Sequence, residues 1–446
     1  MTDFQIYLTI GVFAAVILLI ALDLIDMTVA ALLGVSVLIV FGILDGSDLM
    51  PIVHTAGGPL SLLFGGMVVA RVIGKTGIFD WIGDAFLRAT GGSGRRLLLL
   101  IVALVAPVCA VLPNATAVIL VAPVIIGVCK ALKVDFVGPM LITAIVSNAA
   151  GMLTLVGDPA TFLVGRAIGL TFGDYLRMVS LGGVLAVLAV VPLLPLLLPK
   201  IWAMQVELPA ARPAVTVERP AFLGLSLLVL VTMVALFLFG ESLPAQIVPP
   251  EVAIITAALA LLVIYGVRVE PVSEVIRDVD WKTIVFLGAI FTLVQAFIKT
   301  ELLQGFSIQL YDSFGDDLMR VAILSLAGIG VLSSLLANIP VVAAALVTVT
   351  GYLVVAGAAP ETALAPGFTD WPNATLPVFV AMMFGGTLGG NATLIGASAN
   401  VVAVGICAAN GRRVTFMQFL RIGLPIAVVQ LSVGAIYSLA LGSMLG

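Results

Sequence analysis

Residues 147–161 read SNAAGMLTLVGDPAT, and residues 386–400 read GTLGGNATLIGASAN. When the TLVG of the first phrase is aligned with the TLIG of the second, Gly151 falls on Gly390. Both phrases interrupt long apolar segments, and unwound backbone at membrane depth survives only where protein or a water-filled cavity satisfies its polar groups. Two matched interruptions in the two halves of a membrane chain indicate a transporter's binding site.

The composition excludes a soluble globular protein. The chain is 62% hydrophobic and 10% charged, with a mean hydropathy of +1.26. Many apolar runs reach the ~20 residues that a helix needs to cross the hydrocarbon core. The N-terminal segment lacks a basic region and carries Asp3, so we interpret residues 5–22 as a retained span rather than a signal peptide. We expect an all-α polytopic membrane protein whose surroundings are the lipid bilayer, with no nucleic-acid partner.

The apolar segments predict about ten transmembrane helices and two re-entrant hairpins. The full spans are expected at 5–22, 27–44, 59–78, 136–168, 178–199, 221–240, 247–265, 282–299, 376–408 and 421–444. The hairpins are expected at 97–130, broken at PNAT (113–116), and at 320–356, broken at NIP (338–340). Two short full spans in place of each hairpin would keep the same parity.

The second half of the chain repeats the first. Lys75 matches Lys299 and Asn114 matches Asn338, both at an offset of 224, while the opening phrases match at 239. An Ala/Pro/Gly-rich insert near 356–375 accounts for the difference. Each half has five full spans, an odd number, so the second half should enter the membrane inverted. We therefore predict a first repeat at 1–199, a cytoplasmic linker at 200–219 and a second repeat at 220–446.

The basic residues predict the orientation. In this arrangement fifteen Lys and Arg residues fall on the side opposite the N-terminus, four fall on the N-terminal side, and Arg71 lies within a span. Cytoplasmic loops carry the excess of basic residues. Both termini should therefore face outside, with the first hairpin entering from the cytoplasm and the second from outside.

Two clusters of polar and small residues are candidates for binding a solute or an ion. Asn and Thr supply neutral oxygens, glycines expose backbone carbonyls, and half-helix ends supply partial charges. The simpler explanation for any single Gly or Ser is close helix packing, but the matched pair of clusters favours a binding site. The first cluster contains Asn114, Thr116, Ser147, Asn148, Gly151, Thr154, Gly157, Asp158, Pro159 and Thr161; the second contains Asn338, Gly390, Asn391, Thr393, Gly396, Ser398 and Asn400.

Asp158 is the most informative single residue. Its counterpart in the second phrase is Ala397, so the repeat itself does not require a carboxylate there. A carboxylate within a span costs a few kcal/mol and by default indicates function. It could be a proton carrier, a cation ligand or both. The alternative role is an N-cap of the following half-helix, which Pro159 would begin, and both roles can hold together.

Other residues give weaker signals. Cys109, Cys129 and Cys407 are widely spaced in apolar segments, which predicts inert core thiols rather than a disulfide framework or a thiolate metal site. Arg71 is expected to extend to the cytoplasmic surface, and His54 is expected in a loop. Residues 79–92 and 302–317 are either amphipathic interfacial helices or ordinary loops.

Familiar enzyme and nucleotide motifs do not occur. The sequence has no Walker A motif, no HExxH and no GxSxG. We expect no enzymatic activity, no cofactor and no bound metal. The energy source should be an ion gradient or a cytoplasmic ATPase subunit supplied as a partner.

Three segments resemble the ion transporter superfamily. SNAAGMLTLVGDPAT resembles the first signature of the branch that contains arsenite permease (ArsB), NhaD and P protein. GGNATLIGASANVV at 389–402, followed by FMQFLRIGLP at 416–425, resembles the second signature of that branch. LPNATAVILVAP at 112–123 is similar to the hairpin motif of the divalent-anion sodium symporters. The resemblance extends over nearly the full length.

The resemblance implies a scaffold domain, a moving transport domain, elevator-type alternating access and a homodimer. It groups Asn114, Thr116, Gly157, Asp158 and Thr161 as one half-site, and Asn338, Gly396, Ser398 and Asn400 as the other. This chain departs from the family pattern at Thr161, where Asn is common, and at the second hairpin, where Ala-Asn-Ile replaces Ser-Asn-Thr. A second sodium ion at the less polar half-site is therefore in doubt.

Three transport functions compete. Arsenite or antimonite efflux in exchange for protons needs a site for a small uncharged trihydroxy acid. Sodium–proton antiport needs a carboxylate that alternates between cation and proton, and Asp158 fits either. Sodium-coupled dicarboxylate symport fits less well, because the carboxylate would repel the anion. We expect the arsenite-type antiporter, in the inner membrane of a bacterium or archaeon, with sodium–proton antiport as the alternative.

Overall fold

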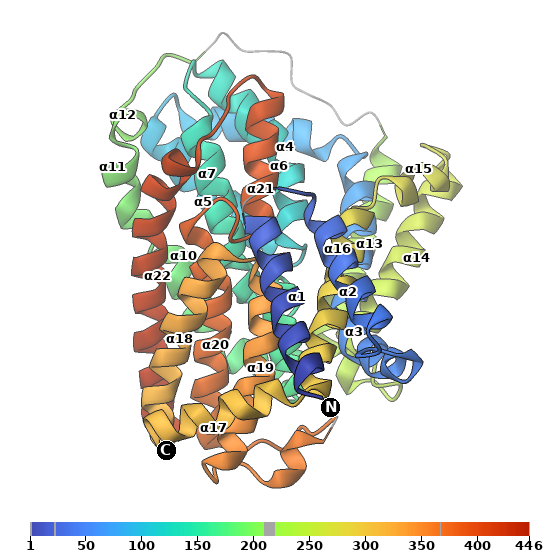
Figure 1. Cartoon of the computed structure of the whole chain (residues 1–446). Helices are drawn as coiled ribbons and strands as arrows, with labels where there is room; N and C mark the ends of the chain where they lie inside the picture. The colour runs from blue at the N-terminus through green and yellow to red at the C-terminus, as the bar shows by residue number, and fades with distance from the viewer. Residues whose placement is uncertain (1, 22–23, 209–218, 366, 446) are drawn as a thin grey trace.

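The structure is a computed structural model that describes residues 2–21, 24–208, 219–365 and 367–445 (Figure 1). No β-strand occurs in these residues. The α-helices are α1 (Asp3–Ala21), α2 (Met27–Val40), α3 (Leu49–Gly74), α4 (Ile78–Thr90), α5 (Gly94–Cys109), α6 (Asn114–Ala131), α7 (Val137–Ala150), α8 (Pro159–Ala167), α9 (Phe172–Met178), α10 (Ser180–Leu188), α11 (Leu194–Leu197), α12 (Pro199–Trp202), α13 (Pro220–Phe239), α14 (Pro249–Val267), α15 (Val272–Arg277), α16 (Trp281–Lys299), α17 (Leu302–Phe314), α18 (Leu318–Leu335), α19 (Asn338–Val355), α20 (Leu376–Gly389), α21 (Ser398–Ala409) and α22 (Phe416–Leu445). Short 3-10 turns are η1 (Gly46–Asp48), η2 (Gly151–Leu153), η3 (Val191–Leu193), η4 (Gly240–Ser242), η5 (Glu361–Leu364), η6 (Asn373–Thr375) and η7 (Gly390–Ala392).

The all-α membrane fold is confirmed. Within the described ranges, ten helices are long and apolar enough to cross a membrane. Their membership differs from the sequence prediction, because α6, α18 and α19 of the expected hairpins are among them. The two expected broken spans instead consist of shorter pieces, α7 with α8 and α20 with α21. Both termini lie at the same end of the molecule, and α12 lies toward the opposite end (Figure 1).

The helices pack as two groups. The first group contains α1, α2, α3, α13, α14 and α16, with α3 packed against α14 and α16. The second group contains α5 to α8, α10 and α18 to α22, in which α20 packs against α18 and α22. Figure 1 shows α13 and α14 at one edge of the molecule and α22 at the other. The groups meet where α16 contacts α19 and where α3 contacts α6 and α8.

Each hairpin packs against the broken span of its own half through the same contacts. The Thr154 hydroxyl donates to the carbonyl of Ala110 at the end of α5, and the Thr393 hydroxyl donates to the carbonyl of Ser334 at the end of α18. Ala110 and Ser334 are separated by the 224-residue offset, and the two threonines by the 239-residue offset. The two contacts therefore join residues that correspond to each other in the two halves of the sequence.

Two helices cross the bundle at opposite ends. Helix α4 follows α3 and packs against α6, while α17 follows α16 and packs against α19. Figure 1 shows α17 lying across the end where both termini are found and α4 near the other end. Both segments, which the sequence left open between helix and loop, are helices.

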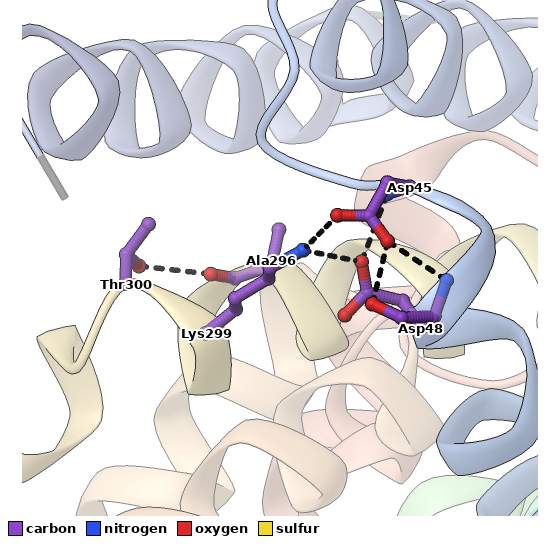
Figure 2. Close-up of polar contacts among 6 residues, drawn as sticks. Asp45, Asp48, Ala296, Lys299 and Thr300 are labelled. Atoms are coloured by element: carbon purple, nitrogen blue, oxygen red, sulfur yellow. Dashed lines mark hydrogen bonds and ion pairs between the residues drawn. The ribbon is translucent and has the colours of Figure 1, made fainter.

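Ion pairs hold the ends of the two helices that precede these crossings. Nζ of Lys299, the last residue of α16, lies 2.7 Å from Oδ2 of Asp48 and 2.8 Å from Oδ2 of Asp45, at the start of α3 (Figure 2). Its ammonium group holds the pKa of Asp45 well below the usual range. Lys75, the matching residue after α3, lies 2.7 Å from Oε2 of Glu270 in the second half. Each half thus supplies the lysine for a carboxylate of the other.

Arg71, which the sequence predicts to extend to the cytoplasmic surface, is partly exposed and pairs with Asp278 and, at 3.6 Å, with Glu270. His54 lies within α3 rather than in a loop, since that helix begins ten residues before the expected span.

The expected span 178–199 is present as Ser180–Leu197, which is long and apolar enough to cross a membrane, but it is not one continuous α-helix. Helix α10 ends at Leu188, and the chain continues through η3, α11 and α12. Pro192, Pro195 and Pro199 interrupt the backbone hydrogen bonds of a continuous helix. Of the expected linker, residues 209–218, which include Arg212 and Pro213, lie outside the described residues.

Candidate functional site

Asp158 stands at the break between η2 and α8 and caps that helix. Its carboxylate accepts a hydrogen bond from the backbone N–H of Thr161 at 3.1 Å, and Pro159 occupies the first helical position. This is the N-terminus chemistry that the sequence Asp-Pro-Ala-Thr favours. The side chain is completely buried. Asp158 therefore caps α8. Its carboxylate also makes three hydrogen bonds that capping does not require.

A carboxylate pocket, formed by Asp158, Thr161, Asn338 and Thr387, joins the two halves of the chain. Oδ2 of Asp158 accepts from the hydroxyls of Thr161 at 3.1 Å and Thr387 at 3.0 Å. Oδ1 accepts from the amide of Asn338 at 3.3 Å. Thr387 lies on α20, and Asn338 is the first residue of α19, so both come from the second half. One carboxylate thus draws donors from a hairpin tip and two broken spans.

The pocket offers the carboxylate neutral partners alone. In the described part of the chain, no Lys, Arg or His bonds to Asp158; its four donors are one backbone N–H, two hydroxyls and one amide. Burial favours the neutral acid, whereas four donors favour the carboxylate. Because these influences oppose each other, a change in the donors can decide whether the group holds a proton.

A second buried cluster, the amide chain, consists of Asn114, Asn148, Asn391, Asn400 and Gln430. Asn114 donates to Oδ1 of Asn148 at 3.0 Å. Asn148 then donates to Oδ1 of Asn391 at 2.9 Å and of Asn400 at 3.0 Å. Asn391 donates to Oε1 of Gln430 at 2.8 Å. The chain begins at the first hairpin tip and crosses to the second half.

Backbone carbonyls fix the direction of the amide chain. Gln430 donates to the carbonyl of Ala186 at 3.0 Å, and Asn400 donates to the carbonyls of Gly390 at 2.9 Å and Thr393 at 2.8 Å. A carbonyl can only accept, so the NH2 groups of Gln430 and Asn400 must face these atoms. Each of the other amides must then donate its NH2 to the side-chain oxygen of the next residue in the chain.

The two clusters occupy matching positions at the 239-residue offset. Thr161 corresponds to Asn400, Asn148 to Thr387 and Asp158 to Ala397. The Thr161–Thr387 hydroxyl contact at 3.3 Å therefore corresponds to the Asn148–Asn400 contact. In each cluster a residue from one half contacts a residue from the other. The second cluster lacks the carboxylate.

The glycines of both phrases allow close backbone crossings. A methyl group on Gly157 would lie 2.6 Å from the carbonyl oxygen of Gly151 and 2.7 Å from that of Cys109. A methyl group on Gly396 would lie 2.5 Å from the carbonyl oxygen of Gly390. These glycines position the two breaks against the hairpins rather than supply side-chain chemistry.

The remaining predicted residues divide into supporting and peripheral positions. Ser147 is buried and donates to the carbonyl of Asn114 at 2.9 Å, which supports the first hairpin tip. Thr154 and Thr393 bond to hairpin carbonyls, as described above. Thr116 is half-buried and Ser398 is exposed, and within the described residues neither side chain joins either cluster. Thus, Thr116 and Ser398 are not brought together with the other candidates.

The contacts divide the polar residues differently from the two half-sites that the resemblance implied. Asn338 was grouped with Asn400, but its side chain contacts Asp158 of the other half. Asn114 was grouped with Asp158, but its side chain joins the amide chain that contains Asn400. The reason is that the breaks of the two halves face each other, which sequence order alone does not reveal.

Sequence reasoning missed two buried residues, Thr387 and Gln430. Thr387 carried a usable signal, because it corresponds to Asn148 and lies within the opening phrase. Gln430 lies in the middle of the long apolar helix α22, whose other amide, Gln418, is exposed near the start of the helix. An isolated polar residue inside a membrane helix is itself a signal, since it needs a partner there.

The described residues contain no group of three or more His, Cys, Asp or Glu side chains able to hold a metal ion. Cys109, Cys129 and Cys407 are buried and unbonded to one another. The two clusters are thus built from hydroxyls, amides, backbone carbonyls and one carboxylate.

Residues 17–367 match the family model described as citrate transporter (CitMHS). The crystal structure of the YdaH transporter of Alcanivorax borkumensis, described as having an unusual topology, superposes with a TM-score of 0.50. It shares 14% sequence identity and covers 90% of each chain, so this likeness concerns the fold alone.

Relatives match over nearly the whole chain. An uncharacterized transporter of Synechocystis is 39% identical over 430 residues, covering 96% of both chains. An uncharacterized transporter of Mycobacterium bovis is 30% identical over 433 residues, also covering 96% of both. Human P protein is 26% identical, and the match covers 99% of this chain and 60% of that protein. This chain therefore belongs to the citrate transporter family of the ion transporter superfamily and is a multi-pass secondary transporter.

Proposed function

We propose that this transporter exports a small uncharged hydroxy acid of the arsenite or antimonite type in exchange for protons, with Asp158 as the proton carrier. The observation that carries the proposal is the carboxylate pocket, in which one buried carboxylate has neutral donors alone. A trihydroxy acid can replace hydroxyl and amide donors without bringing a net charge into the membrane. Ionised Asp158 could accept hydrogen bonds from solute hydroxyls in place of these donors, and a proton bound to Asp158 would remove that acceptor, so that proton and solute would bind alternately.

The family description names citrate, but the carboxylate pocket suits citrate less well than it suits an uncharged hydroxy acid. A citrate ion would bring several negative charges near Asp158. In the described residues, no Lys or Arg bonds to the carboxylate pocket or to the amide chain, so the repulsion would have no nearby compensation. Desolvating an unpaired charge costs several kcal/mol. Citrate therefore belongs among the tested solutes but is not our proposed cargo.

Sodium–proton antiport is the second candidate. Hydroxyl, amide and carboxylate oxygens are the ligands that hard cations prefer. The pocket holds all three types on Thr161, Thr387, Asn338 and Asp158. A sodium ion bound there would replace the proton on the same carboxylate.

Flux in everted vesicles decides among these solutes. Arsenite, antimonite, sodium, citrate and succinate are offered separately with an imposed pH gradient, and proton movement is recorded. We expect saturable uptake of arsenite or antimonite with counterflow and proton release, because a carrier exchanges its cargo. Sodium-dependent proton movement without arsenite flux would favour the second candidate. Citrate-driven proton movement alone would overturn the proposal.

We also propose that residues 1–199 and 220–446 are inverted repeats. The support is the shared register of the Thr154–Ala110 and Thr393–Ser334 contacts. On the basis of the basic residues, the end of the molecule bearing Lys130 and α4 faces the cytoplasm. In this proposal both termini face outside, and the protein lies as a homodimer in a bacterial or archaeal inner membrane. An ATPase partner is not needed if the pH gradient drives exchange.

Two cavities at matching positions support elevator-type alternating access. A cavity of about 50 Å³ lies between the helix groups and includes Ala343, Leu346 and Val347 of α19. A groove of about 460 Å³ includes Ile119, Ala122 and Pro123 of α6, the residues 224 positions earlier. The first is lined by residues of both helix groups, on α3, α8, α16 and α19, whereas the second is lined by residues of α6, including Lys130, and by the end of α21. We therefore assign the structure to a cytoplasm-facing state, with α5 to α8, α10 and α18 to α22 as the transport domain and the first helix group as the scaffold.

Cysteine cross-linking tests this assignment. Thr55 and Leu346 line the small cavity together, and their counterparts at the 224-residue offset are Val279 and Ala122. In a background without native cysteines, we expect Thr55→Cys/Leu346→Cys to cross-link in the cytoplasm-facing state and Val279→Cys/Ala122→Cys to cross-link in the opposite state. Each cross-link should stop transport. Simultaneous cross-linking of both pairs in one molecule would contradict alternating access.

A further inference from the structure

The breaks of the two halves differ at one matched position. Asp158 and Ala397 both adopt extended backbone before a half-helix, with φ −133°, ψ 125° and φ −147°, ψ 148°. A methyl group on Gly151 would lie 3.0 Å from Cβ of Asp158, and one on Gly390 would lie 3.4 Å from Cβ of Ala397. The two Cβ atoms therefore occupy equivalent places. The first place holds a carboxylate, and the second holds a methyl group.

The hairpin tips consequently have different partners. Asn338 at the α18–α19 tip donates to a carboxylate, which can gain a proton or a cation. Asn114 at the α5–α6 tip donates to the amide of Asn148, which keeps the same charge at every physiological pH. Hydrogen bonds to a charged group are stronger than those between neutral groups. Protonation of the acceptor can therefore weaken the Asn338–Asp158 bond but not the Asn114–Asn148 bond.

Gln430 completes the neutral arrangement. It is the link between Asn391 and the backbone of α10, and it is fully buried. Without it, the NH2 of Asn391 would lose its acceptor, and nothing on that side would prevent this amide from turning its own NH2 toward Asn148. Asn148 uses both of its hydrogens in the chain. Gln430, acting through Asn391, and Asn400, held by two backbone carbonyls, thus together hold the orientation of Asn148 that Asn114 needs.

In the described residues, no other charged side chain bonds to the carboxylate of Asp158. Helices α3, α19 and α20 pack against α8. Of these, α20 carries no titratable side chain, α19 carries Tyr352 and α3 carries His54 and Arg71, toward its two ends. Arg166 near the end of α8 is exposed. Buried Tyr175 of α9 donates its hydroxyl to the carbonyl of Met152 and not to Asp158.

We propose that the two hairpin tips are controlled differently: the α18–α19 tip is held or released by the ionisation of Asp158, whereas the α5–α6 tip is locked by the amide chain that Gln430 positions. At the α5–α6 tip, the amide of Asn148 serves as the acceptor that the Asp158 carboxylate provides at the α18–α19 tip. One ionisable group therefore serves each transport domain, and only one hairpin tip responds to it. This inference builds on the proposed proton-carrier role of Asp158, but it concerns the hairpins and not the solute.

Thiol labelling of matched tip positions tests the proposal in the full-length protein. Leu112 and Leu336 are separated by 224 residues and lie at the two tips. Each is changed to Cys in a background without native cysteines, and the maleimide reaction rate is measured from pH 5.5 to 8.5. Dividing by the rate in the Asp158→Asn variant at the same pH removes the intrinsic response of the thiol. We expect this ratio to vary about tenfold for Leu336→Cys, on the scale of one hydrogen bond to a charged group, and to stay flat for Leu112→Cys.

Gln430→Leu should release the other tip. The expected result is about tenfold faster labelling of Leu112→Cys, on the scale of one lost buried hydrogen bond, with Leu336→Cys unchanged. Ser438→Ala is the matched control, because it removes a buried hydroxyl from the same helix that bonds to its own helix backbone at Gly434. Equal increases at both tips would show general loosening and overturn the positioning role.

Ala397→Asp provides a second test that does not depend on the folding of the Gln430 variant. The labelling rate of Leu112→Cys in this variant is divided by its rate in the protein that retains Ala397, at the same pH. A carboxylate placed next to Asn400 should make this ratio depend on pH. A flat ratio in this variant would overturn the proposal. Labelling needs no transported solute, so these results hold or fail independently of the solute. An active arsenite exchanger with pH-independent tips would contradict only this inference.

Discussion

Asp158→Asn is expected to abolish proton-coupled exchange while the protein folds and inserts normally. Asparagine has the same shape and is as good an N-cap as aspartate, so the start of α8 should persist. It cannot take up or release a proton, and its NH2 group would face donors of Thr161, Thr387 or Asn338. Proton movement in everted vesicles and thermal unfolding in detergent measure the two effects separately.

Asp174→Asn is the matched control for this experiment. Asp174 is also near a helix start, because it lies in the first turn of α9 and contacts the N-cap residue Thr171, outside the carboxylate pocket. Its replacement should leave exchange close to the wild-type rate. Wild-type proton coupling in the Asp158→Asn protein would exclude Asp158 as the proton carrier.

Gly157→Ala and Gly396→Ala are each expected to remove transport and to destabilise the fold. The added methyl group would lie 2.5–2.7 Å from backbone carbonyl oxygens of Gly151, Cys109 or Gly390. Backbone cannot move aside as a flexible side chain can, and overpacking of this kind costs about 1–3 kcal/mol. Because the displaced backbone carries the break, the carboxylate pocket and the amide chain should both be distorted. Unfolding temperature and solute flux are the measurements.

Gly127→Ala on α6 and Gly405→Ala on α21 are the controls. A methyl group on either would meet no atom within 4 Å from outside its own helix. Both proteins should transport normally, and alanine favours a helix more than glycine does. If Gly157→Ala and Gly396→Ala behaved like these controls, the close crossings would not matter for transport.

The sequence predicted the fold class because its signals are strong in lipid. Apolar runs of sufficient length must be helices there, since the bilayer offers no other partner for backbone N–H and C=O groups. The doubled phrase then revealed where the helices break. The short pieces between Leu188 and Trp202 were missed, although Pro192, Pro195 and Pro199 were visible, because a long apolar run was read as one helix.

Within the candidate site, residue type was easier to predict than partnership. Asp158, Asn114, Asn148 and Asn400 were recognised as polar groups in apolar surroundings. Their contacts could not be derived, because hydrogen bonds of side chains depend on which helix faces which. Asn338 and Asp158 are 180 residues apart and yet lie at hydrogen-bond distance.

The sequence by itself determined a helical membrane transporter with two matched breaks, one of which carries a carboxylate. The length of an apolar run, its polar breaks and the chemistry of each residue are local properties, which depend only on residues close together in the sequence. The tertiary structure alone decided that Asn338 and Thr387 contact Asp158, and that Gln430 anchors the amides opposite Ala397. The physical reason is that buried polar groups must find partners wherever the folded chain brings donors and acceptors together, and that meeting place is set by helix packing rather than by sequence order.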